Sequence, residues 1–139
     1  MRFTVLAAAG LAAMLAQAAH PETLTIVITG MEETEGDIRL SLYDSEEAFD
    51  QGGEAAERRM QPVTGDEVTM VIDDIPAGHY AVKLYHDADS DGVLDSNMMG
   101  MPTERYGFSN NKGRIGPSPW AEAVFEVSKD ENEISINLR

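Results

Sequence analysis

Four aspartates are crowded into one short stretch of the chain, at Asp87, Asp89, Asp91 and Asp95, with Gly92 among them. The first six positions fit the calcium-loop pattern D-x-D-x-D-G, in which alternate side chains converge and the glycine permits a sharp turn. Converging carboxylates repel one another unless a cation lies between them, and hard oxygen ligands favour a hard cation. The spacing therefore predicts a calcium-type site.

The predicted ligands are four side chains and one main-chain carbonyl: Asp87, Asp89, Asp91, Asp95 and the carbonyl of Val93. The twelfth position, which is a bidentate Glu in an EF-hand loop, is Met98. We expect Glu104, or the amide oxygen of Asn97, to supply the missing oxygen after the chain folds back. The competing interpretation is a plain acidic turn, because Asp, Ser and Gly dominate solvated turns.

The flanks of this acidic stretch do not have the helices of an EF-hand. Residues 79–86 alternate with period two and are rich in strand formers, and residues 96–102 have no helical period and contain Gly100 and Pro102. We therefore expect the acidic stretch to follow a strand.

Two alternative functions use His86. As a catalytic base it would need an orienting partner, but Asp87 is its neighbour in a strand and points to the opposite face. The chain also lacks cysteine and a Gly-x-Ser-x-Gly elbow, so we favour a non-catalytic protein over a periplasmic enzyme. The other alternative is a copper-binding protein, because imidazole and thioethers suit copper(I) and three methionines follow the acidic stretch: Met98, Met99 and Met101. Methionines also cover core edges, and we favour that interpretation.

Several aromatic residues lie beyond the acidic stretch. A surface for a partner is predicted at Tyr106, Phe108, Asn110 and Trp120. The same aromatic side chains could instead be core residues beneath the long segment. The partner, a protein or a small ligand, is not specified by the sequence.

The N-terminus has the pattern of an export signal. Arg2 precedes an apolar stretch, residues 3–15, and a small-x-small pattern predicts cleavage after Ala18. We therefore predict a signal peptide over 1–18, a single domain over 19–139, a periplasmic or secreted location, and no membrane insertion after cleavage. Because the chain has no cysteine, this exported domain would be stable without disulfides.

The chain is strongly acidic, with 25 Asp and Glu against 10 Lys and Arg and a net charge of −15. Loss of Arg2 with the signal makes the domain more negative still. Such a charge argues against nucleic acid and anionic lipid as partners. It leaves cations, cationic partners and neutral ligands open, and we take the domain as a monomer by default.

The remaining pattern predicts an all-β fold. Short alternating strands with turn residues between them are expected over 24–29, 38–43, 68–72, 80–84, 123–127 and 134–138, the last two forming a pair. A helical piece is expected over 45–49, a loop or frayed helix over 50–59, and one long loop over 87–119. This order favours an antiparallel β-sandwich, Ig-like in class, whose long loop carries the acidic turn.

Several blocks of the chain resemble an exported bacterial family, the domain of unknown function 2141. They are residues 74–87, 89–95 and 100–111, with 36–43 near the start and 120–125 near the end. The resemblance implies a prealbumin-like (transthyretin-like) β-sandwich in the periplasm with no established activity. Members of that family often have Asn where this chain has Asp89 or Asp91, and Gly where it has Arg105. The extra carboxylates should strengthen cation binding here.

Overall fold

The computed structural model describes residues 20–111 and 116–139, and the signal peptide predicted over 1–18 lies outside them. The described residues form eight strands and three short helices. In chain order they are β1 (Glu22–Thr29), β2 (Asp37–Tyr43), α1 (Glu46–Gln51), β3 (Glu57–Pro62), β4 (Glu67–Ile75), β5 (Gly78–Asp87), β6 (Tyr106–Phe108), η1 (Ser109–Asn111), α2 (Trp120–Ala123), β7 (Phe125–Val127) and β8 (Glu131–Asn137). None of the helices in the described part has the length and apolar character that a bilayer crossing needs.

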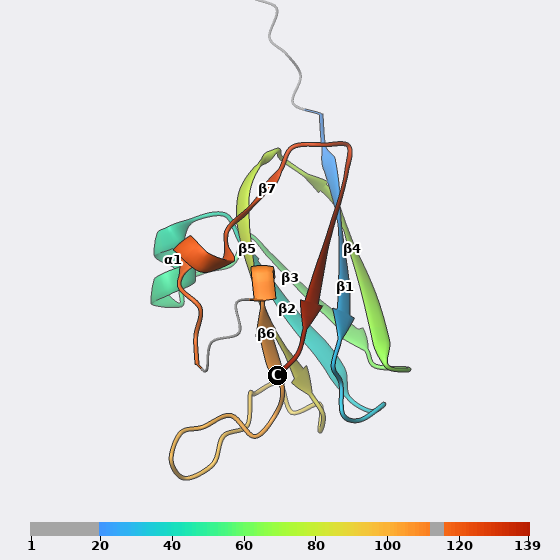
Figure 1. Ribbon diagram of the computed structural model, residues 1–139, viewed down its shortest axis with the longest axis vertical. Coiled ribbons are helices and arrows are strands. Elements are labelled where there is room, and N and C mark those ends of the chain that lie inside the picture. Colours follow the sequence, from blue (N-terminus) through green and yellow to red (C-terminus); the bar gives the residue numbers. More distant parts are fainter. Residues whose placement is uncertain (1–19, 112–115) are drawn as a thin grey trace, which may run out of the picture.

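Two sheets face each other, as the sequence predicted for a β-sandwich (Figure 1). The smaller sheet has the order β4-β1-β8, and the larger has the order β3-β2-β5-β6, with β7 paired to the other end of β5. Strand β1 alternates strictly between buried and half-buried residues, the pattern of a strand with one face on the core. The core between the sheets contains fully buried aliphatic side chains from both: Leu24, Ile26, Ile28, Ile72 and Ile136 from one sheet, and Ile38, Leu40, Leu42 and Val82 from the other.

The end of the chain differs from the prediction of a simple final pair. β7 pairs with β5 in the larger sheet, whereas β8 crosses to the smaller sheet and lies parallel to β1. Two strands joined by a tight hairpin are antiparallel, whereas parallel strands need a crossover connection. β8 can lie parallel to β1 because the chain reaches it by crossing from the larger sheet. The residue expected to begin the strand, Ala123, belongs instead to α2.

Residues 50–59 were expected to be a loop or frayed helix, and part of that expectation is wrong. α1 ends at Gln51, capped by Gly52 with φ of +68°, and β3 begins at Glu57. β3 is an edge strand whose residues are mostly exposed on both faces, so it carries no apolar alternation. A strand of this kind leaves no periodic signal in the sequence.

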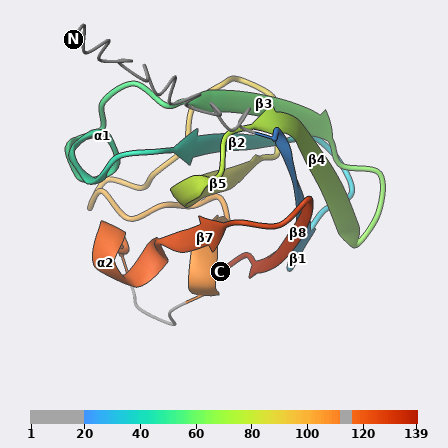
Figure 2. The same ribbon diagram turned by 90° about the horizontal axis from the view of Figure 1, so that it is seen from above.

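A second apolar cluster lies on the outer face of the larger sheet. Phe49 of α1 is fully buried there, with its ring centroid 5.5 Å from Tyr43, 5.9 Å from Trp120 and 6.3 Å from Phe108. Figure 2 shows α1 and α2 lying near each other at this edge of the molecule. Because the cluster covers one end of the outer face, only the other part of that face is open.

Candidate metal centre

The acidic stretch begins where β5 ends. Asp87 is fully buried, and its carboxylate comes within 4.8 Å of those of Asp89 and Asp91. Asp89 also lies within 4.8 Å of the carboxylates of Asp95 and Glu104, counted oxygen to oxygen. The structure therefore brings together five carboxylates, with Asp89 common to both groups.

The loop turns around the Asp87 side chain. The backbone N–H of Asp91 donates to Asp87 Oδ1 over 3.1 Å, and that of Gly92 donates to Oδ2 over 2.8 Å. Gly92 has φ of +82°, a conformation that a side chain would disfavour, and its carbonyl accepts the Tyr85 hydroxyl at 2.9 Å. The tight turn expected from the glycine is thus present.

Asp87 also has a cationic partner, Arg39 of β2, whose Nε donates to Oδ2 over 2.6 Å. Burial would raise the pKa of Asp87, but the hydrogen bonds from Arg39 and the Gly92 amide outweigh it and lower that pKa. The same hydrogen bond raises the pKa of Arg39. Asp87 is therefore held as a carboxylate anion.

The pKa values of Asp89 and Asp95 are shifted in the opposite direction to that of Asp87. Desolvation is the largest cause that raises the pKa of each, and the charges of neighbouring carboxylates raise it further. Within the described chain, the only ion pair of the cluster joins Arg39 to Asp87, so the other four carboxylates have no cationic partner. Their mutual repulsion is the physical reason that a cation would be favoured here.

Glu104 lies where the sequence analysis expected it, folded back onto the loop. Its Oε1 accepts the Ala88 N–H at 3.1 Å and its Oε2 accepts the Asp95 N–H at 3.0 Å. It thus connects both ends of the acidic stretch, and it supplies the carboxylate that the twelfth position, Met98, lacks.

A small hairpin over residues 96–102 brings Glu104 back. Ser96 bridges to Pro102, and the Asn97 N–H donates to the Met101 carbonyl at 2.8 Å. The amide oxygen of Asn97 accepts two backbone N–H groups, from Met99 at 2.9 Å and Met101 at 3.1 Å. Asn97 therefore holds the hairpin turn, and Glu104 is the better placed of the two expected extra ligands.

The three methionines do not cover the core edge, so that interpretation was wrong. Met98 and Met99 are fully exposed near the hairpin tip, and Met101 is half exposed. In Figure 1 the segment between β5 and β6 projects beyond the end of the sheets. Methionines on a projecting hairpin have no core beneath them to cover.

His86 is buried on the opposite face of β5 from Asp87. One of its ring nitrogens, Nε2, lies 2.6 Å from the carbonyl oxygen of Glu35, and its backbone N–H donates to Arg105 O. His86 and Asp87 therefore do not form a base and its orienting carboxylate. The buried imidazole and the exposed methionines also occupy different environments.

The predicted partner surface divides into two parts. Trp120 and Phe108 pack against Phe49 in the second apolar cluster, while the Asn110 amide donates to the carbonyls of Glu122 and Val124. Tyr106 packs edge-on against Phe108, with ring centroids 6.0 Å apart, and its hydroxyl accepts the Gly116 N–H. Tyr106 and Phe108 also line a hollow on the outer face of the larger sheet.

Sequence reasoning did not single out Arg39, although the signal was present. Arg39 falls on the polar side of the alternating stretch over 38–43, in a chain with few cations. Its pairing with Asp87 depends on the register of β2 against β5, in which Asp37 lies opposite Asp87 and Ile38 opposite His86. That register could not be inferred from the sequence.

These features define an all-β sandwich protein with a strand-end acidic loop. A family model described as an uncharacterized protein conserved in bacteria, DUF2141, matches residues 26–135, and the chain belongs to this family. A search of curated proteins and a search of solved structures each found no match. The family recognised from the sequence motifs is thereby confirmed.

Proposed function

We propose that the protein is an exported, non-catalytic accessory module in which Ca²⁺ orders a long surface segment. The observation that carries this proposal is the convergence of five carboxylates from two segments, with Glu104 returning to the loop across the 96–102 hairpin. Calcium accepts six to eight oxygens in irregular geometry, which a loop of this kind can provide.

The residues that would hold the ion are Asp89, Asp91, Asp95 and Glu104, together with the oxygen of Asp87 that does not pair with Arg39. The carbonyl of Val93 stays a predicted ligand. An ion there would offset the desolvation and the carboxylate repulsion that raise the pKa values of Asp89 and Asp95. It would also fix the hairpin, because Glu104 lies just beyond it.

The non-catalytic part of the proposal is supported by the positions of His86 and Asp87 on opposite faces of β5. Export is supported by the signal pattern of residues 1–18. The module would present the ordered segment to a protein or small ligand.

The test is thermal unfolding of the mature protein in EDTA, in millimolar Ca²⁺ and in millimolar Mg²⁺. With a dissociation constant of about 0.1 mM and about 1 mM Ca²⁺, linkage gives about 1.4 kcal/mol of stabilisation. For a domain of this size we expect a rise in Tm of about 5 °C, and little or none with Mg²⁺.

Two variants make the test specific. Asp89→Asn/Asp91→Asn should markedly weaken the calcium response, because it removes the charge of two converging carboxylates. Glu67→Gln/Glu133→Gln removes two exposed carboxylates on the other sheet and should keep the response in full. Both doubles change the net charge equally, so general screening by Ca²⁺ cannot separate them. An equal response in the two doubles, or none in the unaltered protein, would sink the calcium proposal.

A further inference from the structure

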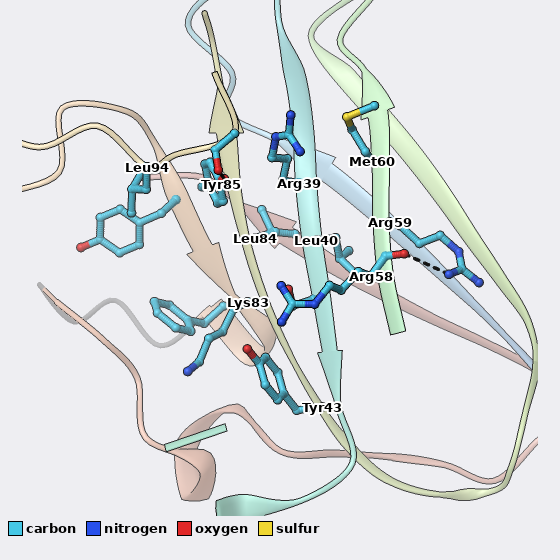
Figure 3. A pocket seen from close by; sticks show the side chains of 14 residues that line it. Arg39, Leu40, Tyr43, Arg58, Arg59, Met60, Lys83, Leu84, Tyr85 and Leu94 are labelled. Atoms are coloured by element: carbon cyan, nitrogen blue, oxygen red, sulfur yellow. Dashed lines mark hydrogen bonds between the residues drawn. The ribbon is translucent and has the colours of Figure 1, made fainter. Parts of the chain in front are cut away.

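A hollow of about 520 Å³ opens on the outer face of the larger sheet, beside the acidic loop. Strands β2, β3, β5 and β6 all contribute to it, and Gly92 and Leu94 of the loop form one end. Tyr43, which belongs to the second apolar cluster, lies at the other end, near Lys83 (Figure 3). Its volume lies in the range of about 300–1,000 Å³ that is usual for small-molecule sites.

The charge of this hollow is opposite to that of the chain. Four cationic residues line it: Arg39, Arg58, Arg59 and Lys83. Among the described residues of its lining none is Asp or Glu, although acidic residues outnumber basic ones by 25 to 10 in the sequence. Arg39 and Arg59 form ion pairs with carboxylates outside the lining, but Arg58 and Lys83 form none within the described residues, and an anion in the hollow would lower the repulsion that remains.

Two of these cations are available to an anion. The Arg58 guanidinium makes no hydrogen bond or ion pair within the described chain, and its side chain runs from β3 over β2 towards Lys83 and Tyr43 (Figure 3). Arg39 uses Nε for Asp87, and its two terminal nitrogens make no hydrogen bond to any described residue. Arg59, in contrast, is paired with Glu57.

Lys83 lies at the end of the hollow that is formed by aromatic rings. Its Nζ is 4.2 Å from the Phe49 ring centroid and 5.1 Å from that of Tyr43, and it donates to the Phe49 carbonyl. Burial lowers the pKa of Lys83, and the charge of the nearby Asp50 carboxylate offsets only part of this effect. An anionic group close to Nζ would compensate the rest.

The walls of the hollow are apolar. Tyr106 and Phe108 of β6 and Leu94 line one side, and Met60 of β3 lies on the other with 56% of its surface exposed. Flat aromatic side chains and a methionine suit a flat or branched apolar body. The hollow thus combines apolar walls with a few cationic groups, as ligand sites commonly do.

We propose that this hollow binds a small organic anion, with its carboxylate or sulfonate near Arg58 and Lys83 and an apolar, preferably aromatic, body against Tyr106 and Phe108. The chain as a whole repels anions, but at physiological ionic strength charges farther than about 8 Å are largely screened. The local cations therefore decide binding. A polyanion such as nucleic acid would meet the acidic loop at one end of the hollow.

The experiment is a fluorescence titration of the mature protein with anilinonaphthalene sulfonate, compared with phenylnaphthylamine, which has the same aromatic framework without the sulfonate. It is done in EDTA, so its result does not depend on a calcium site. We expect saturable binding of the sulfonate at one site, at least about fivefold tighter than the neutral probe, and weaker binding as NaCl rises.

Arg58→Gln is the main variant, because the Arg58 side chain makes no hydrogen bond or ion pair within the described residues, and its carbonyl, which accepts from Arg59, is kept. We expect it to weaken sulfonate binding about fivefold and to leave binding of the neutral probe unchanged. Lys129→Gln removes one charge at the exposed turn before β8 and should change neither. Phe108→Leu should weaken the binding of both probes, which would place their apolar body in the same hollow.

Three results would overturn the proposal. They are equal affinity for the two probes, equal weakening by Arg58→Gln and Lys129→Gln, and the absence of saturable sulfonate binding. Thermal unfolding of each variant accompanies the titration, so that a loss of binding is read only from protein that is folded at the titration temperature.

Discussion

The acidic loop and the cationic hollow adjoin each other on the same two strands, and they are assembled in different ways. The loop gathers its carboxylates mainly from nine consecutive residues, 87–95, and holds Asp87 with backbone N–H groups from the same stretch. The hollow gathers Arg39, Arg58 and Lys83 from three strands, which sheet register alone brings together. One region is local in sequence and the other is a product of pairing.

Arg39 connects the two regions. Its Nε is bound to Asp87 of the loop, and the residue lines the hollow. This ion pair lies at the boundary between the two regions. It is the one described contact through which a cation of the hollow neutralises a carboxylate of the loop. A module with a cation site and an anion site side by side could sense one through the other.

The largest expected effect comes from breaking the base of the loop at Gly36. This residue has φ of +74°, and a Cβ there would lie 2.2 Å from the Asp87 carbonyl oxygen and 2.6 Å from Ala88 Cα. Backbone strain and overpacking together should cost Gly36→Ala about 3 kcal/mol of unfolding free energy or more. Urea unfolding measures this loss.

Gly65→Ala is the matched control, because a Cβ there meets nothing within 4 Å. Its unfolding free energy should stay within about 0.5 kcal/mol of the parent. If Gly36→Ala were as stable as Gly65→Ala, the close approach of the chain at the start of the loop would not be a determinant of this fold.

A smaller effect is expected from pH, and its sign differs within the loop. Asp89 and Asp95 have raised pKa values when folded, so their protonation favours the folded state, and they should add stability as pH falls from neutral towards about 4. Asp87 has a lowered pKa, so its contribution is present above the unfolded value of about 3.9 and is lost as pH falls through its folded pKa.

The measurement is the unfolding free energy in urea between about pH 4 and 7.5, taken as the difference between the parent and Asp89→Asn/Asp91→Asn. In calcium-depleted buffer the unfolding free energy of the parent should rise relative to that of the variant as pH falls, because the variant no longer has a carboxylate at residue 89. With Ca²⁺ the trend should reverse, since protons then compete with the ion. If the parent instead became less stable relative to the variant as pH falls without calcium, the repulsion inferred for the loop would be contradicted.

The smallest expected effect tests the connection between the two regions. Calcium near Asp87 should weaken the hold of that carboxylate on Arg39 and strengthen binding of anilinonaphthalene sulfonate by about two- to threefold. By linkage the sulfonate must strengthen calcium binding by the same factor, so titrations in both orders should agree. Asp89→Asn/Asp91→Asn should reduce the effect at a fixed Ca²⁺ concentration, and weaker sulfonate binding in calcium would refute the connection through Arg39.

Much of the fold could be predicted because most strands have one face on the core. β1, β2 and β4 alternate between buried and more exposed residues, and that period is visible in the sequence. β3 was not predicted because it is an edge strand exposed on both faces. β6 was not predicted because a strand of three residues is too short to show a period. The place of β8 beside β1 depends on a crossover that no local pattern reports.

The candidate site shows the same division. The sequence by itself determined the family, the sandwich class and the acidic turn, because short-range periodicity, a glycine and alternate aspartates act within a few residues of one another. Only the tertiary structure decided that Glu104 returns to the loop, that Arg39 pairs with Asp87, and that Arg58 and Lys83 share a hollow. Those contacts join residues of different strands and loops, and their geometry is set by strand register and chain reversal rather than by any local preference.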